Sequence, residues 1–169
     1  MSAEPEPTAP PPEINGPEDF APAVRWGVAT AIAEGARTLY AVDHAFGENW
    51  PWDDAPMLAQ LAGWLRLPQR RLVLLAANYD EVPRLHPRFV VWRRDWAHAI
   101  TPLAAPEELE ASLPTALLDD RRLSVVRLDP VRGRGRVSLE PRTRLHWMEQ
   151  VDAVLQRSGP AFPVTTLGL

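Results

Sequence analysis

Two nearly continuous apolar runs occur along the chain, at residues 38–43 and 72–77. Runs of this length without polar alternation are typical of strands that are buried on both faces, as in parallel sheets. Between them, residues 53–66 carry apolar side chains at helical spacing, and Pro56 falls in the first turn, where proline is tolerated. A strand, a helix and a second strand with short joints predict a right-handed βαβ unit.

The same reading predicts further elements on both sides of this unit. A helix is expected from Pro22 to Gly35, and a last helix is expected from Pro141 to Ser158. The remaining expected elements are a short helix at 89–95, strands at 98–103, 115–118, 123–128 and 137–140, and a glycine-rich turn at 131–136. The predicted fold class is α/β: a single layered domain over residues 22–169, with a mixed sheet of a βαβ core and later antiparallel strands, flanked by helices.

The first 21 residues have a different composition from the rest of the chain. They hold five acidic residues, no basic residue, many prolines and few apolar side chains. Such a segment cannot bury enough surface to offset its ordering entropy, so residues 1–21 are predicted to be a disordered acidic tail. The segment lacks the basic start and apolar stretch of a signal peptide, and no run approaches the roughly 18 apolar residues of a membrane span. We therefore expect a cytoplasmic protein of bacterial type that does not enter a membrane.

Composition excludes several kinds of chemistry. All 18 basic side chains are arginine, and the chain has neither lysine nor cysteine. This excludes P-loops, Schiff-base enzymes, thiol nucleophiles and cysteine-ligated metals. The four histidines show no spacing typical of a metal site, and no motif indicates a cofactor, so neither is expected. Removing the five acids of the tail from the total of 22 leaves 17 against 18 arginines, and this near-neutral body argues against a strongly electrostatic partner.

Polar side chains follow the two predicted buried strands. Asp43 and His44 come at the end of the first, and Asn78 and Asp80 come after the second. Because the carboxyl ends of neighbouring parallel strands meet at one edge of a sheet, these four residues are predicted to form a ligand pocket. The structural alternative is that polar residues follow strands simply because loops are exposed to water.

A second candidate cluster combines imidazole and guanidinium groups. Its members are His86, Arg88, Arg93 and His98. Arginine can clamp a phosphate or carboxylate through two parallel hydrogen bonds, and a nearby histidine can act as a base near neutral pH. The alternative is a surface helix with salt bridges such as Arg94 to Asp80 or Glu81.

Two further features each allow a binding and a structural interpretation. In the loop at 45–52, Trp50 and Trp52 could stack on a base or a partner's side chain, or they could cover an edge of the core. The glycines and arginines at 133–136 are compatible with a nucleic-acid contact or with a hairpin turn between two strands.

The order of these features resembles a half-domain of the phospholipase D-like superfamily. The matching features are a buried strand ending in aspartate, a Trp-Pro loop, a helix, the strand LVLL, HPRF, an arginine pair, ALLDDRRLSVVRLD and a final helix with tryptophan. The resemblance covers residues 37–158. Within this superfamily, the chain more narrowly resembles a bacterial group of degenerate phospholipase D-like domains. Domains of this group sometimes lie C-terminal to acetyltransferase domains.

The family's catalytic signature is H-x-K, then four residues and an aspartate. Counting back from Asp119 or Asp120 places Ser112 and Pro114, or Leu113 and Thr115, where histidine and lysine belong. The motif is therefore missing in both registers, and phosphodiesterase activity of this type is not expected. The resemblance implies a non-catalytic binding or regulatory domain that keeps a groove or a homodimer face, with a phosphate-bearing ligand or nucleic acid as candidate partners.

Two other hypotheses come from the residues alone. One is a hydrolase or transferase with His86 or His98 as base and Arg88 or Arg93 as anion clamp; it requires these groups to converge on one pocket. The other is a protein–protein interaction module whose acidic, proline-rich tail recruits a partner.

Overall fold

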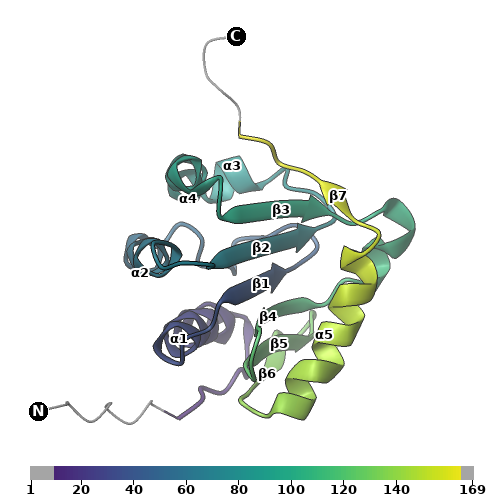
Figure 1. Cartoon of the computed structure of the whole chain (residues 1–169). Coiled ribbons are helices and arrows are strands. Elements are labelled where there is room, and N and C mark those ends of the chain that lie inside the picture. Colours follow the sequence, from purple (N-terminus) through teal and green to yellow (C-terminus); the bar gives the residue numbers. More distant parts are fainter. Residues whose placement is uncertain (1–9, 165–169) are drawn as a thin grey trace, which may run out of the picture.

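A computed structural model of the chain describes residues 10–164, and its strands form one seven-stranded sheet with helices on both faces (Figure 1). The order of the strands is β6-β5-β4-β1-β2-β3-β7. The strands are β1 (Thr38–Val42), β2 (Arg71–Ala76), β3 (Ile100–Ala104), β4 (Thr115–Asp119), β5 (Ser124–Asp129), β6 (Arg134–Ser138) and β7 (Gly159–Pro160). The helices are η1 (Pro17–Asp19), α1 (Phe20–Ala33), α2 (Ala55–Leu65), α3 (Val82–Leu85), α4 (Pro87–Trp92), η2 (Arg93–Trp96), η3 (Glu107–Ser112) and α5 (Pro141–Leu155).

The centre of the sheet is the predicted βαβ unit. Strands β1 and β2 pair in parallel with Thr38 opposite Arg71, and α2 connects them. Strand β3 adds a second parallel pair on one side, whereas β4, β5 and β6 extend the other side as an antiparallel series. The predicted α/β class with a mixed sheet is therefore confirmed.

The two faces of the sheet bury two separate apolar cores. Helices α1, α2 and α4 cover one face, and α5 covers the other (Figure 1). Along β2, Leu74 belongs to the larger core and Leu75 to the smaller one; along β4, Leu117 and Leu118 divide in the same way. Because successive side chains of a strand point to opposite faces, burial on both faces explains the continuous apolar runs in the sequence.

Several boundaries differ from the sequence predictions. The short helix expected at 89–95 is α4 followed by the 3₁₀ turn η2, and β3 begins at Ile100, two residues later than expected. Strand β6 begins at Arg134, inside the predicted turn, because it pairs with β5 from Arg134 onward. The two-residue strand β7, which pairs with the end of β3, was not predicted, since Gly159–Pro160 has no strand pattern of its own.

The N-terminal boundary also differs from the one predicted at residue 22. Ile14 is only 2% exposed and pairs with Gly135 of β6, whose backbone N–H donates to the Ile14 carbonyl oxygen at 3.0 Å. Phe20 opens α1 and is fully buried. These two buried side chains anchor the segment 10–21 to the core. The prediction of disorder from its acidic, proline-rich composition is therefore wrong for these residues. The rest of the predicted tail, residues 1–9, lies outside the described residues.

Candidate binding cleft at the end of β1

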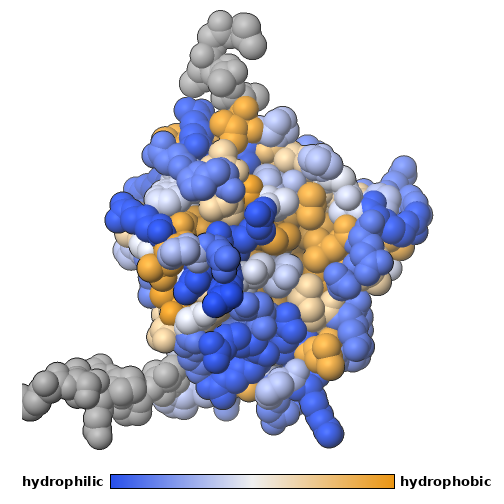
Figure 2. All heavy atoms as spheres, in the orientation of Figure 1, coloured by the Kyte–Doolittle hydropathy of each residue, from blue (hydrophilic) through white to orange (hydrophobic). Residues whose placement is uncertain are grey.

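A cleft of about 400 Å³ opens at the carboxyl end of β1, where the segment before β4, the end of β5 and helix α5 meet. Its lining residues are Asp43, His44, Ser112, Leu113, Pro114, Thr115, Arg127, Leu128, Pro130, Trp147 and Gln150. Figure 2 shows a group of hydrophobic side chains to the right of centre, in the area that α5 and the strand ends occupy in Figure 1. Six of the eleven lining residues are polar or charged, so polar groups and apolar side chains share the walls of the cleft.

Asp43 anchors one side of this cleft. The carboxylate is 7% exposed, and both of its oxygens are engaged. Its Oδ2 accepts the backbone N–H of Phe46 at 2.9 Å, and its Oδ1 accepts the hydroxyl of Thr115 at 2.6 Å. These bonds fix the start of the loop after β1 and tie it to β4, so Asp43 shapes the cleft and has little capacity left for a ligand.

Arg127 supplies the positive charge of the cleft. It lies near the end of β5, half-buried, and its Nη2 donates to Thr115 Oγ1 at 3.4 Å. The ion pairs of residues 10–164 do not include Arg127. A guanidinium has five N–H donors in a fork that matches a carboxylate or phosphate. With the half-buried Trp147 also lining the cleft, the arrangement suits an anionic group attached to an apolar or aromatic body.

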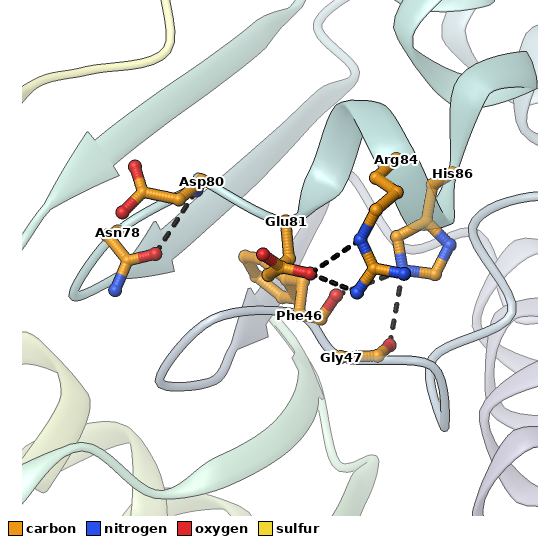
Figure 3. Close-up of polar contacts among 7 residues, drawn as sticks. All are labelled: Phe46, Gly47, Asn78, Asp80, Glu81, Arg84 and His86. Atoms are coloured by element: carbon orange, nitrogen blue, oxygen red, sulfur yellow. Dashed lines mark hydrogen bonds and ion pairs between the residues drawn. The ribbon is translucent and has the colours of Figure 1, made fainter.

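The first predicted pocket is only half assembled. Asp43 and His44 line the cleft, and the backbones of the two loops meet as expected: the His44 carbonyl oxygen accepts the N–H groups of Ala77 and Asn78. The Asn78 side chain instead accepts the backbone N–H of Asp80 at 3.1 Å within its own turn (Figure 3). Neither Asn78 nor Asp80 lines the cleft, because this local turn takes up the amide and Asp80 is exposed.

The four side chains of the second predicted cluster do not converge. His86, Arg88 and Arg93 line three different cavities. Arg93 is buried, donates to the Phe162 carbonyl oxygen and lies 3.9 Å from the centre of the Phe162 ring; burial lowers the pKa of its guanidinium. His98 is exposed, with its ring 6.1 Å from that of Trp96.

The prediction that this cluster forms one anion pocket is therefore wrong. The four residues lie on consecutive turns between the end of α3 and the start of β3, and their side chains face different surroundings. The ion pairs within residues 10–164 do not include the alternative salt bridge from Arg94 to Asp80 or Glu81, and Glu81 pairs with Arg84 (Figure 3).

The structural interpretations of the aromatic loop and the glycine-rich segment hold. Trp50 and Trp52 are buried and stack on each other with ring centres 5.8 Å apart. Gly133 has a φ of +71°, and a Cβ on Gly135 would lie 2.2 Å from the Val126 carbonyl oxygen. Both glycines are thus required by the β5–β6 hairpin and its close contacts.

Sequence reasoning missed Arg127 and Trp147. Both lie in predicted elements, but neither follows a strand of the βαβ unit, and strand ends are where the sequence predicts a pocket. The available signal is weak: an arginine near the end of strand 123–128, whose other residues are apolar except Ser124.

The likeness of this chain to known proteins is one of fold. No family model matches it, and no curated protein matches it. Among solved structures it is similar to TrmBL2, described as an archaeal chromatin protein that shows a novel mode of DNA binding, with a TM-score of 0.59 and 10% identity. The match covers 90% of this chain and 55% of TrmBL2, so the chain spans about half the length of that protein. At this identity the likeness shows a shared fold.

No helix within residues 10–164 is long and apolar enough to cross a membrane.

Proposed function

We propose that the chain is a non-catalytic, phospholipase D-like binding domain, and that the cleft at the end of β1 binds a phosphate-bearing ligand. The observation that carries this proposal is Arg127, a half-buried guanidinium that lines the cleft and belongs to none of the ion pairs of the described residues. A phosphate would accept two parallel hydrogen bonds from it.

The position of the missing catalytic motif supports the same cleft. Whichever aspartate is used for counting, the places of the H-x-K histidine and lysine fall within residues 112–115, and all four of these residues line the cleft. None of them is a histidine or lysine, so the segment lacks the histidine nucleophile of the H-x-K motif. The combination favours ligand binding without phosphodiester cleavage.

The other walls indicate what the ligand carries besides phosphate. Trp147 offers an aromatic surface, and base–aromatic stacking contributes roughly 1–3 kcal/mol per base. The near-neutral charge of the body favours a short contact with one or two phosphates over a long electrostatic track. We therefore propose a nucleotide or the end of a single strand as the ligand class. DNA binding by TrmBL2 is a further reason to include DNA among the probes.

The test is a titration of the purified protein with labelled single- and double-stranded DNA and RNA and with mononucleotides, at about 50 and 200 mM salt. Arg127→Ala is compared with Arg142→Ala, which removes an exposed arginine from the first turn of α5. We expect Arg127→Ala to weaken binding about tenfold or more, because a charge-assisted pair is lost, and Arg142→Ala to leave it nearly unchanged. Absence of binding at low salt, or equal losses in the two variants, would contradict the proposal.

Other expectations from the sequence remain predictions. These are the homodimer, the cytoplasmic and bacterial setting, and recruitment of a partner by the acidic N-terminal segment. The enzyme hypothesis with a histidine base and an arginine clamp loses its support, because its four groups do not share a cavity.

A further inference from the structure

A second cavity, of about 340 Å³, lies between α3, the junction of α4 with η2, and the segment that follows β7. This segment runs back along β3 towards α3 (Figure 1), and its Ala161 N–H donates to the Pro102 carbonyl oxygen. The cavity shares no lining residue with the cleft at β1. We propose that it binds a small carboxylic acid in its ionised form, with the carboxylate on Arg93 and an apolar or aromatic body against the walls.

The first observation is that Arg93 is a buried cation without a carboxylate beside it. It is 4% exposed, and the ion pairs of residues 10–164 do not include it. Burial lowers the pKa of its guanidinium, and the charge of Arg94 acts in the same direction. Tyr79 acts in the opposite direction, but its hydroxyl is neutral because burial raises its own pKa. An arginine stays charged even so, and buried charges are normally paired, so this position suits an added anion.

The second observation is that Arg93 keeps free donors at the cavity. A guanidinium has five N–H groups. Among the described residues, Nη2 donates to the Phe162 carbonyl oxygen, whereas Nε and Nη1 have no acceptor. Neither of these two nitrogens is among the fully enclosed side-chain atoms that lack a partner, and Arg93 lines the cavity. A carboxylate in the cavity therefore finds N–H groups that the protein itself does not use.

The guanidinium is also held in one orientation. Its Cζ lies 3.9 Å from the centre of the Phe162 ring, and this ring stacks on that of Tyr79 with centres 5.1 Å apart. The Tyr79 hydroxyl donates to the Leu103 carbonyl oxygen at 2.7 Å, which ties the stack to β3. Donors that are already fixed lose little side-chain entropy when an anion binds, so the arrangement favours binding.

The walls indicate which kind of anion fits. None of the described lining residues is acidic, and Arg94 is the second basic one. Because Arg94 is exposed, the buried positive charge is the single one of Arg93, which a carboxylate matches. A phosphate monoester carries about −1.5 to −2 charges at pH 7 and is more costly to bury. The remaining walls suit an apolar body, since they are formed by Pro83, Val90, Phe162, Pro163 and Val164.

The test follows the Nε–H resonance of Arg93 in the full chain by nuclear magnetic resonance, with the signal assigned through its contact with the Phe162 ring. Benzoate is the probe, and benzamide is the matched control because it has a similar shape without the charge. We expect a saturable shift with benzoate in the millimolar range and binding at least about tenfold weaker with benzamide, because charge-assisted hydrogen bonds are lost. Phenyl phosphate should bind more weakly than benzoate. No shift in the folded parent, equal affinity for benzamide, or tighter binding of phenyl phosphate would overturn the proposal.

Variants distinguish ligand binding from the structural role of Arg93. Arg94→Gln removes an exposed charge from the cavity, and we expect benzoate affinity to fall about two- to fivefold while stability is unchanged. Arg142→Gln makes the same change at an exposed position outside the cavity and should bind like the parent. Arg93→Lys keeps the charge without the planar fork, and we expect it to lose the benzoate response of the amide resonances at 162–164. Arg127→Ala should respond like the parent, which separates this cavity from the cleft. Equal affinities in the Arg94 and Arg142 variants, or loss of the response in Arg127→Ala, would contradict the proposal even if Arg93→Lys failed to fold.

Discussion

Two buried aspartates occupy opposite ends of the β1–β4 pair and do different things there. Asp119 lies opposite Leu39, near the start of β1, and Asp43 follows the last residue of the same strand. The Oδ1 atom of Asp119 accepts three consecutive backbone N–H groups, those of Arg121, Arg122 and Leu123, each at 2.9 Å. Asp43 accepts only one backbone N–H, and its other partner is a hydroxyl from the neighbouring strand.

The difference follows from the connections at each end. Near Asp119 the turn at 120–123 is short, so the backbone folds over the carboxylate and leaves it fully buried. Burial raises the pKa of Asp119, although the three N–H groups act in the opposite direction. Near Asp43 the loop to α2 runs from residue 43 to 54, and a cleft stays open beside the carboxylate. The same side chain thus closes a turn at one end and shapes a binding site at the other.

The largest effect is expected at the closed end. Asp119→Ala removes the acceptor of three N–H groups, one buried and two part-buried, so we expect the free energy of unfolding to fall by about 3 kcal/mol. Urea denaturation followed by circular dichroism measures this change. Asp119→Asn keeps a carbonyl oxygen for the same groups and should lose less than half as much. If the alanine variant were as stable as its parent, Asp119 would not be the anchor of the turn.

A smaller stability loss is expected at the open end. Asp43→Ala removes one backbone and one hydroxyl partner, so unfolding should become easier by about 1–2 kcal/mol. The variant should also lose ligand binding in the cleft, because Thr115 and the loop lose their fixed positions. Thr115→Val, which removes only the hydroxyl, is the control and should lose about 1 kcal/mol. A larger loss at Asp43 than at Asp119 would reverse the comparison.

Arg127 should separate binding from stability. Its side chain is half-buried, and its hydrogen bond to Thr115 Oγ1 is long at 3.4 Å. We therefore expect Arg127→Ala to change the free energy of unfolding by no more than about 0.5 kcal/mol while it weakens ligand binding. Parallel urea and ligand titrations check both parts. A large loss of stability would mean that Arg127 holds the cleft together.

The smallest expected effect is a change in the pH dependence of stability, through Glu34 near the turn that Asp119 closes. The hydrogen bond and charge of Arg122 lower the pKa of Glu34, outweighing the effect of burial. A carboxylate with a lowered pKa stabilises the folded chain at neutral pH, and this contribution disappears as the pH falls through the lowered value, below 4.5. In Glu34→Gln the stability of the folded chain should fall less between pH 7 and about pH 3, because this contribution is already absent. Thermal unfolding over this pH range measures the change. If the stability of the parent and of Glu34→Gln changed equally with pH, the Glu34–Arg122 pair would contribute nothing to stability.

The sequence carries most of the information on the sheet. The runs at 38–43 and 72–77 indicate burial on both faces, and the division of Leu74 and Leu75 between two cores is the physical reason. The ends of strands are harder to predict where pairing with a segment distant in the sequence determines them. Strand β6 extends into the glycine-rich segment because Gly135 pairs with Arg127 on one side and with Ile14 on the other.

The candidate site was less predictable than the sheet. Adjacency of strand ends correctly predicts that Asp43 and His44 line a pocket, but it does not show that Asn78 closes its own turn. Arg127 and Trp147 reach the cleft only through the packing of β5 and α5, which no local pattern reports. In the same way, the sequence shows His86 as a candidate base, whereas the fold makes it a buried support for the loop after β1.

The pairing of Ile14 with Gly135 has a practical consequence for measurements of self-association. Ile14 covers part of the outer edge of β6, and an exposed strand edge is a ready template for pairing with another chain. A shortened chain that begins at Pro22, the boundary suggested by composition, would lose this cover together with the buried Phe20. Such a chain should aggregate through its β6 edges, and light scattering would then report oligomers that arise from the truncation. Experiments that test the predicted homodimer therefore require a chain that retains residues 10–21.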